Sequence, residues 1–179
     1  MRGLLLVALS FAACAAQLSV APLFPLSGAA PDLGLILFAA LSWRLGVASL
    51  LPAVPAYAAF FALLAGRSPL LSFVAYAGAA SAFLLAARPV PGSRRPAERV
   101  GGAAALAALA LAGLWSRATF AVGSILAGAS AGPWTLLSEL LLPGALLDLA
   151  FYFFLVLLPG LVGWLLRGIA RRGSRTYAV

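Results

Sequence analysis

The chain has 179 residues, 64% of them hydrophobic, and its twelve basic residues are all arginine against four carboxylates, which gives a formal net charge of +8. It has no His and a single Cys, Cys14, so an intramolecular disulfide is excluded and most side chains used in acid-base, nucleophilic and metal chemistry are missing. The arginines flank apolar segments, so the charge indicates membrane topology and contact with anionic lipid rather than nucleic-acid binding.

Apolar segments of bilayer-crossing length recur along the chain with almost no soluble sequence between them. A hydrocarbon core of about 30 Å needs roughly 20 apolar residues of helix. The first such segment covers residues 3–21 and could alternatively be a cleaved signal peptide, since small residues around Ala13 suit cleavage and the sequence before Cys14 approaches a lipoprotein box. We expect an uncleaved span, because the apolar character continues past Gln17.

A turn-rich loop rich in Pro and Gly, from Pro22 to Pro31, separates this segment from the next. Asp32 follows Pro31 at the start of a second span over residues 31–44, closed by Arg44. A carboxylate at this position favours a helix start, where it can bind free backbone amides, and the alternative is a partner contact or an ion pair that holds the outer loop.

The third and fourth spans are predicted over residues 46–65 and 70–87. Pro52 and Pro55 should kink or locally open the third span. The fourth span carries small residues between Ala75 and Ser81 that would let another helix approach closely.

The most polar stretch, residues 88–99, is expected to be a cytoplasmic loop by the positive-inside rule. A fifth span follows over residues 101–122 and contains Arg117. We interpret Arg117 as an interfacial residue that ends a span of ordinary length, because an unpaired charge at the bilayer centre is costly; the alternative is a buried charge in a longer helix.

Residues 123–133 are rich in small side chains and predict an irregular or re-entrant stretch, followed by an interfacial segment with Glu139. The last span is predicted over residues 143–166, with a basic cytoplasmic tail at 167–179. Asp148 lies near the start of this span and is either a dipole-stabilised interfacial carboxylate or a functional one. If it is buried, it should pair with an arginine, and Arg117 is the nearest candidate.

Together these segments predict an all-α polytopic membrane protein, a single integral domain over residues 1–179 with six helices in one compact bundle. Both termini are expected in the cytoplasm, because Arg2, Arg44, the 88–99 loop and the C-terminal arginines then lie on one side. Five spans remain the alternative if the second or fifth is re-entrant.

The sequence resembles the family of the rod-shape-determining protein MreD in three motifs. They are the stretch from Gln17 to Pro22, the Pro31–Asp32 opening of the second span, and its close from Trp43 to Gly46. The resemblance implies a multi-pass protein of the bacterial inner membrane, without enzymatic activity or cofactor, that belongs to the cell-elongation machinery.

The same resemblance implies binding to the single-span protein MreC, and contact, directly or through MreC, with the peptidoglycan synthase formed by RodA and a class B penicillin-binding protein. MreB filaments are a further expected partner. The alternative is a substrate-binding S-component of an energy-coupling-factor micronutrient transporter, although a chain without Asn and with Gln17 as its single Gln offers few polar groups for such a site. No residue is expected to be catalytic or to bind a metal or cofactor. The candidate partner or structural residues are Gln17, Pro31, Asp32, Arg44, Arg117 and Asp148.

Overall fold

The computed structural model describes residues 2–26, 29–87, 100–128 and 135–160. Regular secondary structure in these ranges is helical, apart from an isolated bridge between Leu26 and Ala29. The α-helices are α1 (Arg2–Ser19), α2 (Leu33–Arg44), α3 (Leu50–Ala65), α4 (Pro69–Ala86), α5 (Gly102–Leu126) and α7 (Leu142–Tyr152). The shorter elements are the 3-10 helices η1 (Ala21–Leu23) and η2 (Val47–Ser49) and the π-helical segments η3 (Leu136–Leu141) and η4 (Phe153–Leu157).

Five helical segments in the described ranges are long and apolar enough to cross a membrane, which makes the fold compatible with a membrane bundle. They are Arg2–Leu23, Val47–Ala65, Pro69–Ala86, Ala103–Leu126 and Ser138–Gly160. The helix α2 has 12 residues and therefore rises only about 18 Å, well short of a hydrocarbon core of about 30 Å. The second predicted span is thus a helix that cannot cross a bilayer by its own length.

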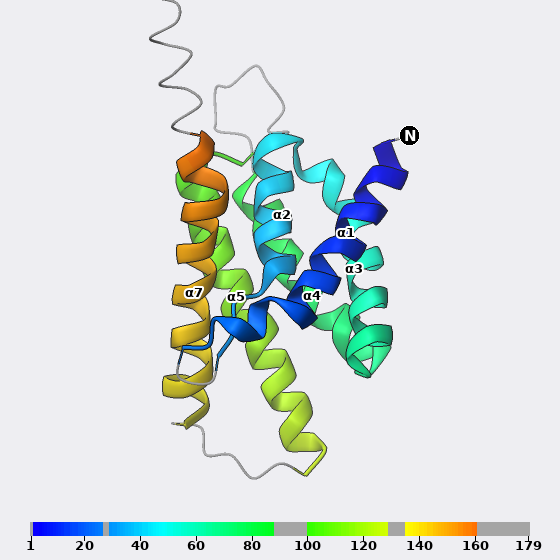
Figure 1. The fold of residues 1–179 in the computed structure, drawn as a ribbon, viewed down its shortest axis with the longest axis vertical. Coiled ribbons are helices and arrows are strands. Elements are labelled where there is room, and N and C mark those ends of the chain that lie inside the picture. The colour runs from blue at the N-terminus through cyan, green and yellow to red at the C-terminus, as the bar shows by residue number, and fades with distance from the viewer. Residues whose placement is uncertain (1, 27–28, 88–99, 129–134, 161–179) are drawn as a thin grey trace, which may run out of the picture.

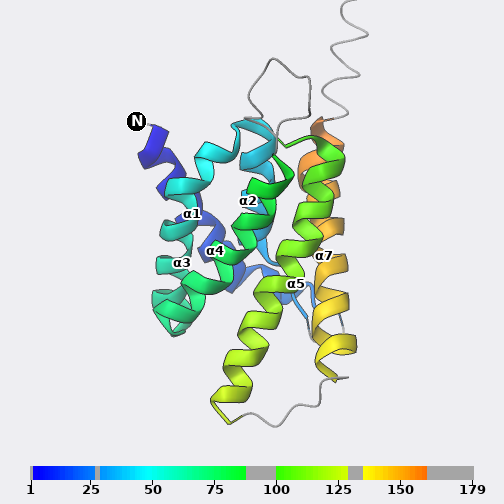
Figure 2. The same cartoon turned by 180° about the vertical axis from the view of Figure 1, so that it is seen from behind.

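The helices form one bundle in which α2 occupies the centre (Figure 1). The start of α1, the end of α2, the end of α4 and the start of α5 lie together at one end, and α2 begins about halfway along the bundle. The view from behind shows α4 and α5 side by side, the most extensive pairing among the described helices (Figure 2). Because α2 contacts α1, α3, α4, α5 and α7, it is enclosed on nearly all sides.

Aromatic side chains fill the space between α2 and its neighbours α3, α4 and α5. The rings of Tyr57 and Tyr76 meet edge to face with centroids 4.8 Å apart, and Phe38 contacts both. Gly34 of α2 lies against the ring of Tyr57, at a distance that leaves no room for a Cβ atom. The missing side chain at Gly34 therefore lets α2 approach α3 closely, as small residues do between membrane helices.

Two predicted span boundaries differ from the observed helix ends. The fifth helix does not end at residue 122 but continues to Leu126, so the start of the predicted irregular stretch is helical, while residues 129–134 lie outside the described residues. The last helix begins before residue 143, because η3 already places Glu139 in a helical turn that continues into α7. These extensions occur because apolar side chains continue past Gly123 and before Pro143. The predicted loop 88–99 and tail 167–179 also lie outside the described residues.

Candidate functional site

The central feature of the bundle is a buried ion pair between Arg117 of α5 and Asp148 of α7. The guanidinium Nη1 donates to Oδ2 of Asp148 at 2.5 Å, and Nη2 donates to Oδ1 at 3.0 Å. The side chain of Arg117 is 9% exposed and that of Asp148 is 0% exposed. The pair is therefore bidentate, which adds both energy and geometric specificity to the charge interaction.

The ion pair also binds the backbone that leads from α1 into α2. Oδ1 of Asp148 accepts a hydrogen bond from the backbone N–H of Asp32 at 2.6 Å. Nη2 of Arg117 donates to the carbonyl oxygen of Ala30 at 3.2 Å. Backbone outside a helix is tolerated deep in a membrane protein only where other groups satisfy its polar atoms. The ion pair supplies those groups at the point where the chain turns into α2.

Every backbone N–H from residue 32 to residue 36 has a partner at this helix start. The side chain of Gln17 accepts from Leu33 at 2.6 Å, and Oδ1 of Asp32 accepts from Gly34 and Leu35 at 3.1 and 3.3 Å. The N–H of Ile36 then makes the first helical bond, to the carbonyl of Asp32. A helix start normally leaves four N–H groups without a partner in the helix. The cap residue Asp32 accepts from two N–H groups here, and side chains from α1 and α7 accept from two more.

The second oxygen of Asp32 faces α4. The hydroxyl of Tyr76 donates to Oδ2 of Asp32 at 3.4 Å, which links the charged cluster to the aromatic side chains in the core. Two carboxylates and one guanidinium therefore meet in the interior of the bundle. We call Gln17, Asp32, Tyr76, Arg117 and Asp148 the buried polar network.

Two glycines make room for the network. A Cβ atom at Gly144 of α7 would overlap Nε of Arg117, and one at Gly113 of α5 would lie 2.9 Å from Oδ2 of Asp148. The carbonyl of Gly113 also accepts a hydrogen bond from Nη1 of Arg117 at 3.4 Å. The guanidinium therefore lies flat against the backbone of two helices, a position that larger side chains at either glycine would block.

The interfacial interpretation of Arg117 is wrong, because the residue lies inside a helix that continues for nine more residues, to Leu126, and its side chain is buried. The interfacial interpretation of Asp148 is also wrong, because its side chain is fully buried. Their pairing, expected for the case in which both are buried, is confirmed. An unpaired charge in the interior would be costly, and that cost was the reason to place Arg117 at the interface. Here the buried guanidinium and the buried carboxylate pair with each other, so neither charge is unpaired.

The remaining predicted residues divide into two groups. Gln17, Pro31 and Asp32 all belong to the region of the network, and the predicted cap on the amides that follow Asp32 is confirmed. Arg44 does not belong to it: its side chain stacks on the ring of Trp43 at 4.3 Å, at the end of α2.

The sequence did not identify Tyr76, Gly113, Gly144 and the carbonyl of Ala30 as members of the site. The spacing of Gly113 and Arg117 could have indicated contact, because residues four apart share a helix face. Nothing local marks Gly144 or Ala30, which meet Arg117 only through the packing of different helices.

The contacts of the network join side chains and backbone of four helices. Its charged groups bind one another and the backbone, and among the described residues no group of three His, Cys, Asp or Glu side chains is arranged to hold a metal ion. Neither Arg117 nor Asp148 lines the groove between α4 and α5, the cavity between α3 and α4, or the cavity at the start of α1. The arrangement can hold α1, α2, α5 and α7 in fixed register.

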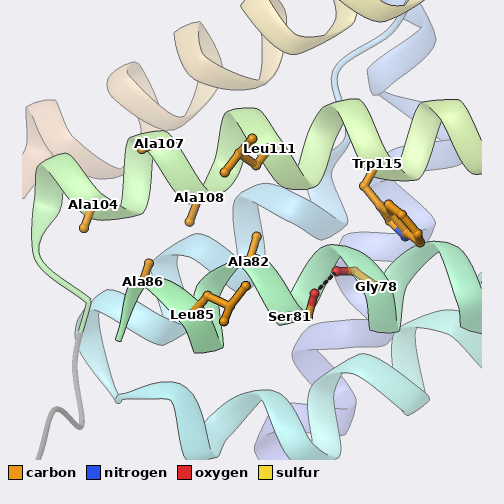
Figure 3. Close-up of a pocket in the computed structure, with 10 residues that line it drawn as sticks. All are labelled: Gly78, Ser81, Ala82, Leu85, Ala86, Ala104, Ala107, Ala108, Leu111 and Trp115. Carbon is orange, nitrogen blue, oxygen red and sulfur yellow. Dashed lines mark hydrogen bonds between the residues drawn. The ribbon is translucent and has the colours of Figure 1, made fainter. Parts of the chain in front are cut away.

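A groove of about 520 Å³ lies on the outside of the bundle between α4 and α5 (Figure 3). Small side chains from both helices face it, and Trp115 reaches over Gly78, where a Cβ atom would overlap the indole. The indole N–H donates to the carbonyl of Val74 at 3.3 Å, so the ring is fixed as one end of the groove. The lining residues are Gly78, Ser81, Ala82, Leu85, Ala86, Ala104, Ala107, Ala108, Leu111 and Trp115.

Comparison with known proteins does not assign the chain to a family. No family model, curated protein or solved structure matches it. The function therefore has to be argued from the buried polar network, from the α4–α5 groove and from the motif resemblance.

Proposed function

We propose that the protein is a non-enzymatic membrane scaffold of the bacterial cell-elongation complex, one that binds MreC and helps to organise the peptidoglycan synthase. The identity of the complex comes from the resemblance of the first fifty residues to MreD. The proposed mechanism rests on two features of the bundle: the buried polar network, which holds the helices together, and the α4–α5 groove, which is open to a partner.

The observation that carries the scaffold mechanism is the α4–α5 groove. Half of its ten lining residues are alanine, whose small side chains let a further helix approach the backbone closely, and membrane helices associate through such close packing. The hydroxyl of Ser81 is already bonded to the carbonyl of Gly78 at 2.5 Å, so a partner would meet a surface without unsatisfied donors. An apolar helix fits such a surface, and the membrane span of MreC is the helix proposed to bind there.

The buried polar network supports the same mechanism. The carboxylates of Asp32 and Asp148 and the guanidinium of Arg117 are engaged inside the bundle, so they are not free to bind a substrate. A protein whose charged interior groups hold its own helices together offers a rigid outer surface, and rigidity lowers the entropy lost when a partner docks.

The test is affinity purification of the tagged chain from its native membrane in mild detergent, with the bound proteins identified by mass spectrometry. We expect MreC together with RodA and its penicillin-binding protein. Recovery of paired ATPases with a coupling transmembrane subunit would refute the scaffold and favour the micronutrient transporter.

A matched pair of variants tests whether the groove is the docking surface. Ala107 is exposed and lines the groove, whereas Ala59 is an exposed alanine of α3, outside the groove. We expect Ala107→Leu to lower MreC recovery about tenfold, which corresponds to a packing penalty of about 1.4 kcal/mol. We expect Ala59→Leu to leave recovery unchanged. Equal recovery of MreC with both variants would show that the groove is not the docking surface. Membership in the elongation complex would still be tested separately, by the proteins that co-purify.

A further inference from the structure

A second cavity lies at the end of the bundle where α1 begins. It has a volume of about 510 Å³ and lies between the first two turns of α1 and the segment that leads from α2 into α3. Figure 1 shows the start of α1 beside this segment. The lining residues are Arg2, Leu5, Leu6, Leu45, Ala48 and Ser49, and we call this cavity the Arg2 pocket.

Arg2 supplies the only charge among the lining residues. Within the described ranges the single ion pair joins Arg117 to Asp148, so no described carboxylate neutralises Arg2. Glu139 lies in η3, which belongs to the opposite end of the last helix. The pocket therefore presents a guanidinium that lacks an anionic partner in the described part of the chain.

The walls below this charge are apolar and open to the surroundings. Leu5 is 60% exposed and Leu45 is 59% exposed, while Leu6 is buried behind them. The hydroxyl of Ser49 donates to the carbonyl of Gly46 at 2.6 Å, so its proton is already used inside the protein. A ligand that complements these groups carries a negative charge next to a hydrocarbon chain.

We propose that the Arg2 pocket binds an anionic phospholipid, with the lipid phosphate on the guanidinium of Arg2 and an acyl chain against Leu5 and Leu45. Arginine matches phosphate oxygens with two parallel N–H donors, and acidic lipids supply such phosphates at a membrane surface. The pocket lies at the start of the first apolar helix, so the charge of Arg2 is next to the apolar wall. A phospholipid likewise has its charged phosphate next to its hydrocarbon chains. This site is separate from the α4–α5 groove and does not depend on the scaffold proposal.

The test measures lipid binding to the purified full chain by native mass spectrometry in mild detergent. Phosphatidylglycerol is the probe, and phosphatidylcholine with the same acyl chains is the uncharged comparison. We expect Arg2→Gln to weaken phosphatidylglycerol binding about tenfold, as loss of a charge-assisted hydrogen bond to phosphate predicts. Ala48→Leu, which places a larger side chain at an exposed lining position, should weaken it without removing any charge.

Two arginines serve as controls for general surface charge. Arg44 lies at the same end of the bundle but outside the pocket lining, and Arg67 lies between α3 and α4 at the other end. We expect Arg44→Gln and Arg67→Gln to bind phosphatidylglycerol as the unmodified protein does. The proposal is overturned if Arg2→Gln and Ala48→Leu both bind normally, if all three arginine variants lose binding equally, or if phosphatidylcholine binds equally well. Competition by millimolar inorganic phosphate would overturn the lipid assignment in favour of a free phosphate site.

Discussion

Replacing Asp148 with Asn should destabilise the bundle by breaking the ion pair that Asp148 forms with Arg117. The substitution keeps the shape of the side chain but removes its negative charge. Arg117 then remains buried beside an amide that can accept through only one oxygen, in place of the two carboxylate oxygens that accept from its Nη1 and Nη2. The N–H of Asp32 also loses its charged acceptor, and it loses any acceptor at this position if the amide nitrogen takes the place of Oδ1.

The magnitude follows from the cost of an uncompensated buried charge. Breaking a buried ion pair by removing one partner typically costs 3–5 kcal/mol. Two features of this bundle place the value near the lower end, at about 3 kcal/mol. The carboxylate of Asp32 remains in the cluster, and Arg117 keeps its bonds to the carbonyls of Ala30 and Gly113.

Unfolding of the full chain by sodium dodecyl sulfate in mixed micelles, followed by circular dichroism, measures this loss. Glu139→Gln is the matched control, because Glu139 is an exposed carboxylate in the same helical segment, and its change should stay within about 0.5 kcal/mol. Arg117→Gln combined with Asp148→Asn should cost less than the sum of the two single changes, since the second substitution removes the stranded partner. An Asp148→Asn protein as stable as the Glu139→Gln control would refute the buried pair.

Three further changes test other parts of the network. Gly144→Ala should lower the free energy of unfolding by about 1–3 kcal/mol in the same assay, because its Cβ meets Arg117, whereas Gly101→Ala, which meets nothing within 4 Å, should be neutral. Gln17→Leu should speed deuterium exchange at the amide of Leu33, which loses its acceptor, and exchange equal to that of the unmodified protein would show that Gln17 does not hold this amide. Asp32→Ala should cost about 0.5–2 kcal/mol through loss of the cap, with Asp32→Asn closer to the unmodified protein, and the reverse order would contradict the capping role.

The parts of the fold that depend on local pattern could be predicted from the sequence. Apolar length predicts the long helices, because each must cover its backbone with its own hydrogen bonds. The Pro31–Asp32 pair predicts the start of α2, since a carboxylate before an apolar run satisfies the next amides, and the structure confirms both bonds. These features need information from only a few neighbouring residues.

The position of Arg117 could not be predicted in this way. Its partner Asp148 is 31 residues further along the chain, and its backbone acceptor at Ala30 is 87 residues earlier. When each span is considered alone, Arg117 is a single arginine in an apolar helix. An interfacial position is then predicted, because an unpaired charge in the interior is costly. The cost disappears once α7 and the start of α2 pack against α5, and only the three-dimensional arrangement reveals that.

The short length of α2 explains why the bundle needs a charged interior. A helix that begins halfway along the bundle brings a turn of non-helical backbone with it, and each unsatisfied polar group there would cost several kcal/mol in an apolar environment. Gln17, Asp32, Arg117 and Asp148 supply bonds to this backbone from three helices and from the cap position of α2 itself. The side chains that look most functional in the sequence are therefore those the fold needs to keep α2 in the centre. We therefore propose the α4–α5 groove and the Arg2 pocket, rather than the network, as binding sites.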